Sequence, residues 1–135
     1  MPTDLRKLRD LAMRYTAAWC SQNPASVAAL YSHDGSLTVN DNPPAVGRTA
    51  ITEVVQSFMT AFPDLCIVMD DLVLQGDQPQ YYWTLTGTHT GPGGTGHRVR
   101  VSGLERWRLG ANDSIASSQG HFDAAEYRRQ LEQGV

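Results

Sequence analysis

The sequence predicts a single α+β domain in which helices precede an antiparallel sheet. Up to residue 62, most apolar residues recur at the three- and four-residue spacing of helices. From residue 65 onward, runs of alternating apolar and polar residues are separated by turn residues, which is typical of strands. The chain has 135 residues and is 41% hydrophobic, which suits one globular domain. We therefore expect one domain over residues 1–135.

Two helices are expected at the start of the chain. The first begins after Thr3, a suitable N-cap, and carries apolar residues on one face as far as Trp19. It ends before Pro24, because proline disfavours helical geometry in the residue that precedes it. Pro24 then opens a short second helix over 24–32, since proline is well suited to the first turn.

A strand and a third helix follow. Residues 33–35 (HDG) are typical of a turn, and residues 36–41 (SLTVND) alternate as a strand does. The third helix covers 49–62, with Thr49 or Thr52 as its N-cap.

The rest of the chain is expected to form an antiparallel meander closed by a short helix over 123–133. Its strands are bounded by glycine, proline, asparagine or aspartate and cover 65–75, 80–90, 97–109 and 114–122.

Between the two longest strands, Gly91, Gly93 and Gly96 spell the G-x-G-x-x-G motif of dinucleotide-binding proteins. That motif binds pyrophosphate only between a strand and a helix N-terminus. Here it joins two strands, so we interpret the glycines as a hairpin connection.

Side-chain alternation places two acids on apolar strand faces. Asp41 shares a face with Leu37 and Val39, and Glu105 shares one with Val101 and its apolar neighbours. The arginines of the same strand point the other way. Burying an unpaired carboxylate is costly unless it is paired, hydrogen-bonded or protonated. Two inward acids in one apolar pocket beneath the first helix are thus the strongest functional signal.

Composition argues against several classes of partner. The net charge of −3 does not suit a nucleic-acid or anionic membrane surface, and no apolar run approaches bilayer length. We read no secretory signal and expect a cytoplasmic protein, with Cys20 and Cys66 as buried free thiols. No set of metal-ligand residues stands at a recognisable spacing, so we expect no metal.

Several stretches in this order resemble the nuclear transport factor 2-like superfamily, which includes ketosteroid isomerases, SnoaL-like polyketide cyclases and limonene-epoxide hydrolases. They are MRYTAAWCSQNPASVAALYSHDGSLTVND, GRTAITEVVQSFMTAFPDL, TLTGTHTG, VSGLERWRL and GHFDAAEYRRQL. The resemblance implies a cone-shaped, curved antiparallel sheet with three N-terminal helices on its concave face and an apolar pocket between them. It also implies a homodimer formed through the sheet and chemistry without a cofactor.

The resemblance to ketosteroid isomerases implies three catalytic roles. Tyr15 falls where those enzymes keep an oxyanion-binding phenol, and Asp41 where they keep the base. Glu105 falls where they carry a protonated aspartate, and its extra methylene departs from that pattern. Such a site moves a proton next to a carbonyl group while two donors stabilise the enolate oxygen.

The last third of the chain resembles SnoaL-like cyclases more closely. There Asp123 falls near their acid–base aspartate, with His121 two residues earlier. Epoxide hydrolases of this fold use an Arg-x-Asp pair where this chain has Arg100 and Ser102, without the acid, so that activity ranks lower.

We therefore expect a cofactor-independent isomerase or cyclase acting on an apolar cyclic or polyketide-like substrate. The alternative is a non-catalytic ligand-binding or dimerisation module on the same fold. Each acid also has a structural interpretation, since Asp41 could cap a turn and Glu105 could pair with an arginine. The residues expected to contact a ligand are Trp19, Val55, Phe58, Met59, Trp83, His89 and Trp107.

Overall fold

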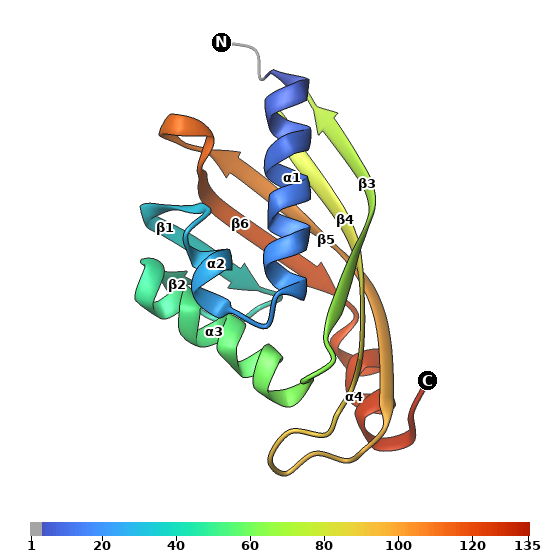
Figure 1. Cartoon of the computed structure of the whole chain (residues 1–135). Coiled ribbons are helices and arrows are strands. Elements are labelled where there is room, and N and C mark those ends of the chain that lie inside the picture. The colour runs from blue at the N-terminus through green and yellow to red at the C-terminus, as the bar shows by residue number, and fades with distance from the viewer. Residues whose placement is uncertain (1–3) are drawn as a thin grey trace.

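The computed structural model describes residues 4–135 and confirms the α+β class: a curved, open six-stranded sheet carries helices on one face (Figure 1). None of the described helices has the length and apolar character needed to cross a membrane. The elements are α1 (Leu5–Cys20), α2 (Pro24–Ala28), β1 (Tyr31–Val39), β2 (Ala45–Val46), α3 (Arg48–Ala61), β3 (Cys66–Gln75), β4 (Gln78–Thr88), β5 (Arg98–Leu109), a 3-10 turn (Ala111–Asp113), β6 (Ile115–Phe122) and α4 (Ala124–Gln133).

The sheet has the strand order β2-β1-β6-β5-β4-β3. Strands β3 to β6 form the expected antiparallel meander. β1 instead pairs with β6 in parallel, with Leu37 opposite Ser118, so the sheet is mixed rather than wholly antiparallel. This pairing is possible because α3 and the whole meander separate the two strands in sequence, which leaves ample chain for a crossover.

The first strand is longer than the sequence predicts. β1 begins at Tyr31, so the second helix is shorter than expected, and residues 33–35 lie within the strand rather than in a turn. The register with β6 shifts between Tyr31 and Ser36, which marks a bulge. This irregular pairing breaks the alternation pattern that a sequence reading relies on.

Helix starts also differ from the predicted caps. The expected N-cap Thr3 lies outside the described residues, and Asp4 caps α1 by accepting a hydrogen bond from the Arg6 amide at 2.9 Å. Neither Thr49 nor Thr52 caps α3, which begins after Gly47. Gly47 has a φ of 89°, a backbone conformation that glycine adopts without steric cost.

The glycine-rich segment connects β4 to β5, as expected for a hairpin. Gly93 and Gly96 have φ angles of 74° and 79°, so the loop uses their conformational freedom to turn the chain. The loop also touches α3, because the Gly91 amide donates to the Ala61 carbonyl at 3.2 Å.

An aromatic cluster fills the core where α1 crosses the sheet. Tyr15, Tyr31, Tyr81 and Trp107 are all at most 1% exposed. Tyr81 stacks on Trp107 with ring centroids 5.0 Å apart, and Tyr15 meets both rings edge-on. The phenol hydroxyls and the indole N–H of this cluster need partners, and those of Tyr15 and Trp107 point at one side chain of β5.

Candidate functional site

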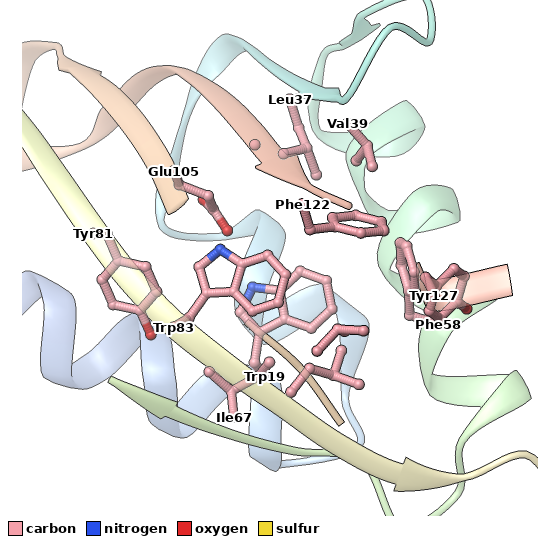
Figure 2. Close-up of a pocket in the computed structure, with 13 residues that line it drawn as sticks. Trp19, Leu37, Val39, Phe58, Ile67, Tyr81, Trp83, Glu105, Phe122 and Tyr127 are labelled. Carbon is pink, nitrogen blue, oxygen red and sulfur yellow. The ribbon is translucent and has the colours of Figure 1, made fainter. Parts of the chain in front are cut away.

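An apolar pocket lies between α1, α3, α4 and the inner face of the sheet, with a free volume of about 50 Å³ (Figure 2). Among residues 4–135, Glu105 supplies the only carboxyl group on its wall. Its wall is formed by Trp19, Leu37, Val39, Phe58, Ile67, Tyr81, Trp83, Leu85, Val101, Glu105, Gly120, Phe122 and Tyr127.

Strand alternation brings Glu105 to this pocket. Along β5, Val99, Val101, Glu105 and Trp107 are buried while the arginines at alternate positions are exposed, as the sequence predicts. Glu105 lies opposite Tyr81 on β4 and Gly120 on β6, so it stands in the middle of the sheet. Its side chain is almost completely enclosed, with the residue 8% exposed.

One oxygen of Glu105 receives all of its hydrogen bonds. Oε1 accepts from the Tyr15 hydroxyl at 2.8 Å, from Trp107 Nε1 at 3.0 Å and from the Ser118 hydroxyl at 2.6 Å. The Tyr15 hydroxyl also shares a 2.9 Å hydrogen bond with that of Tyr31. Oε2 takes part in none of these bonds, so it is the oxygen left for a molecule in the pocket.

Burial raises the pKa of Glu105 above its ordinary value, although the hydrogen bonds from Ser118, Trp107 and Tyr15 oppose the rise. Burial also raises the pKa of Tyr15 well above its usual range, and the adjacent Glu105 charge adds to that effect. Because three donors already point at Oε1, a proton on the neutral acid belongs on Oε2. The neutral form therefore offers an O–H donor to the pocket.

The expectation that Asp41 enters this pocket is wrong. β1 ends at Val39, and Asn40 has a φ of 51°, in the left-handed region, so strand alternation no longer holds at the next residue. Asp41 is exposed and lines a second, open depression together with His121. Phe122 borders both the pocket and this depression.

Asp123 and His121 also lie outside the pocket. Asp123 is the N-cap of α4 and accepts a hydrogen bond from the Glu126 amide at 3.0 Å, so its position has a structural explanation. His121 is exposed on β6 and faces away from the side of the strand that carries Ser118 and Gly120.

Three of the seven predicted ligand contacts line the pocket: Trp19, Phe58 and Trp83. The other four lie elsewhere in the structure. Val55 and Met59 are buried in the core, Trp107 lies behind Glu105 as its hydrogen-bond donor, and His89 accepts from the Thr95 amide in the β4–β5 loop.

Tyr31, Phe122 and Tyr127 belong to the site and its surroundings but are not among the residues predicted from the sequence. Phe122 and Tyr127 close the pocket near α4 and meet edge-on, with ring centroids 5.5 Å apart. The apolar positions of the last helix, Tyr127 and Leu131, could have revealed this contact. Tyr31 could not be identified as a partner of Tyr15 while it was placed at the end of a helix.

The two cysteines differ from expectation, since Cys66 is exposed and Cys20 is only half-buried. Cys66 alternates with the buried residues Leu65 and Ile67, so its side chain takes the outer side of β3. Both thiols are free, with their sulfur atoms 3.9 Å apart.

Glu105→Gln should make stability less dependent on pH. The folded protein holds the Glu105 proton more tightly than the unfolded chain, because its folded pKa is raised. That contribution is fully present below the unfolded pKa and is lost as the pH rises through the folded pKa. We expect urea unfolding between about pH 4 and pH 8 to show the wild type losing stability relative to the variant. The opposite slope would mean that the fold favours the ionised acid.

The sequence matches the family described as SnoaL-like polyketide cyclase over residues 9–131. No curated protein matches it. Among solved structures, a candidate SnoaL-like polyketide cyclase from Jannaschia sp. CCS1 is 15% identical, with a TM-score of 0.84 over 100% of this chain and 99% of that chain. TsrD from Streptomyces laurentii is 22% identical, with a TM-score of 0.82 over 96% and 97%.

A third neighbour, from Catenulispora acidiphila DSM 44928, is a hypothetical protein with a ketosteroid isomerase-like fold in complex with trimethylamine. It is 17% identical, with a TM-score of 0.79 over 90% of this chain and 92% of that chain. At these identities the likenesses establish the fold, and they agree with the shape of the sheet and helices described above.

Proposed function

This chain belongs to the SnoaL-like polyketide cyclase family, and we propose that it binds a small apolar carbonyl compound in its pocket and exchanges a proton with it through Glu105. The observation that carries the proposal is the buried carboxyl group of Glu105. Its Oε1 accepts three hydrogen bonds, while its Oε2 accepts none of them and is left for a ligand in the pocket. A rigidly held acid with a raised pKa suits general acid catalysis near neutral pH.

In the proposed step, Oε2–H gives its proton to the carbonyl oxygen of the ligand. A base removes a proton from the adjacent carbon, the C–H electron pair forms a carbon–carbon double bond, and the C=O π electrons become an O–H bond. The product is an enol, the intermediate shared by isomerisation and by aldol-type ring closure.

Among the described residues, the pocket wall supplies no second carboxylate or imidazole beside Glu105. Asp41 and His121 line a depression on the opposite face of the sheet, together with Tyr82, Ser102 and Leu104, so neither reaches a ligand in the pocket. We therefore assign the base to solvent water that enters with the ligand.

Deuterium exchange into a small apolar ketone tests the role of Glu105. In D2O, the protein should accelerate exchange of the α-protons of 2-indanone, followed by proton NMR. Glu105→Gln should reduce that acceleration by about a hundredfold, because the variant cannot release a proton from the pocket oxygen. Glu53→Gln, on the exposed face of α3, is the matched control. Equal exchange in the two variants would contradict the proposal.

A non-catalytic ligand-binding role is the second candidate. The described residues of the pocket wall include no carboxylate or imidazole other than Glu105, which favours this role because the chain then supplies no base for proton transfer. A protein of this kind would bind 2-indanone, which a rise in melting temperature would show. It would not accelerate deuterium exchange of the α-protons of 2-indanone through Glu105.

A further inference from the structure

Two polar groups face the pocket without partners. Among the side chains of residues 4–135, the only fully buried nitrogen or oxygen atoms that lack a hydrogen bond are Nε1 of Trp19 and Nε1 of Trp83. Each residue is 8% exposed, and both line the pocket. An unpaired buried donor destabilises the fold, so both groups are suited to a partner that the protein itself does not supply.

The two indoles have different surroundings. Trp19 meets Tyr15 edge-on, with ring centroids 6.4 Å apart, and its N–H lies near the Tyr15 hydroxyl without completing a hydrogen bond to it. The Trp19 N–H is therefore directed at the core cluster. Trp83 makes no contribution to the hydrogen bonds of Glu105 or of any tyrosine, so its N–H is the one available to a ligand.

The orientation of Trp83 is fixed by its neighbours. Trp83 is on β4, directly opposite Gly103 of β5. Because Gly103 has no side chain, the indole has room to lie close to β5. Phe122 meets the ring edge-on from the other side, with centroids 5.9 Å apart. Glu105 is two residues beyond Gly103 on the same face, and in Figure 2 the Trp83 nitrogen and the Glu105 carboxyl point toward one another.

We propose that Trp83 Nε1–H and neutral Glu105 Oε2–H form a two-donor subsite that binds a single acceptor oxygen on a flat apolar ligand. The assignment rests on the proposed function, because it places the ligand in the same pocket and uses the same carboxyl group. It adds a residue to which the family resemblance assigns no catalytic role, and it defines which oxygen of the substrate is recognised.

The chemistry of the subsite defines the ligand class. Two converging N–H and O–H donors require an oxygen with two free lone pairs, such as that of a ketone, an enol or a phenol. The remaining wall is aromatic and aliphatic, which suits a ring attached to that oxygen. An ammonium group, which only donates, would leave both donors unpaired.

Matched fluorinated probes test the subsite. 4-Fluorophenol and 4-fluorotoluene differ only in the group at one end of the ring, and fluorine NMR titration measures both without relying on tryptophan. Wild-type protein should prefer the phenol, and Trp83→Phe should lose about tenfold in phenol affinity while toluene affinity changes little. Trp19→Phe removes an indole from the same pocket and should retain the phenol preference.

The indole N–H resonances of the unaltered protein give a second readout, which does not depend on a variant that folds. The phenol should shift the Trp83 N–H signal downfield, and the toluene should not. An unchanged Trp83 signal, or equal loss of both probes in Trp83→Phe, would overturn the subsite while leaving the pocket intact. Failure of both probes to bind wild-type protein would overturn the pocket, and with it both the subsite and the proposed function.

Discussion

Glu105→Leu should lower the free energy of unfolding by about 3 kcal/mol at a pH where the acid is neutral. Leucine nearly preserves the volume but removes the acceptor of three buried donors. Tyr15 can turn to Tyr31, whose hydroxyl is 2.9 Å away, so its loss is partly compensated. Trp107 Nε1 and the Ser118 hydroxyl would remain unpaired, at about 1–3 kcal/mol each.

Glu105→Gln is the control for that loss, since its amide oxygen can still accept the same bonds. Urea unfolding followed by tryptophan fluorescence compares the two variants directly, because all three tryptophans are buried. Equal stability of the leucine and glutamine variants would show that the hydrogen bonds to Oε1 contribute nothing to the fold. The comparison also separates the structural role of Oε1 from the chemical role proposed for Oε2.

The alternation of apolar and polar residues correctly predicted the sheet and the inward position of Glu105, because the strands concerned are regular. β5 is regularly paired with β4 from Arg98 to Arg106 and keeps its register with β6 from Gly103 to Arg108, so a period of two carries Glu105 inward. β1 has a bulge and ends at Val39, and alternation extrapolated past its end placed Asp41 on the wrong side. Local pattern therefore predicts a site residue only where the strand is regular.

The aromatic residues illustrate a second limit. Trp83 and Trp107 lie on the same inward face, yet Trp83 lines the pocket while Trp107 supports Glu105 from the core. No residue spacing in the sequence encodes that difference. The subsite proposed for Trp83 likewise depends on Gly103 of the neighbouring strand. That Gly103 lies opposite Trp83 is known only once the register of β4 and β5 is known.

Gly103→Ala should be strongly destabilising, by about 3 kcal/mol. A methyl group at this position would clash with Cζ2 of Trp83 and lie 2.5 Å from the carbonyl oxygen of His121, far inside contact distance. The indole could move only by leaving its place against Phe122, and the carbonyl belongs to the backbone of β6. Overpacking of this kind costs about 1–3 kcal/mol or more.

Gly120→Ala is the matched control, because it adds the same methyl group to the adjacent strand beside Glu105. There the nearest atoms would be at 3.5 Å and 3.7 Å, which is ordinary contact. We expect urea unfolding to place this variant within about 1 kcal/mol of wild type. In Gly103→Ala, the displaced indole should also abolish the preference for 4-fluorophenol over 4-fluorotoluene. A stable Gly103→Ala protein that kept this preference would mean that Trp83 does not lie against β5.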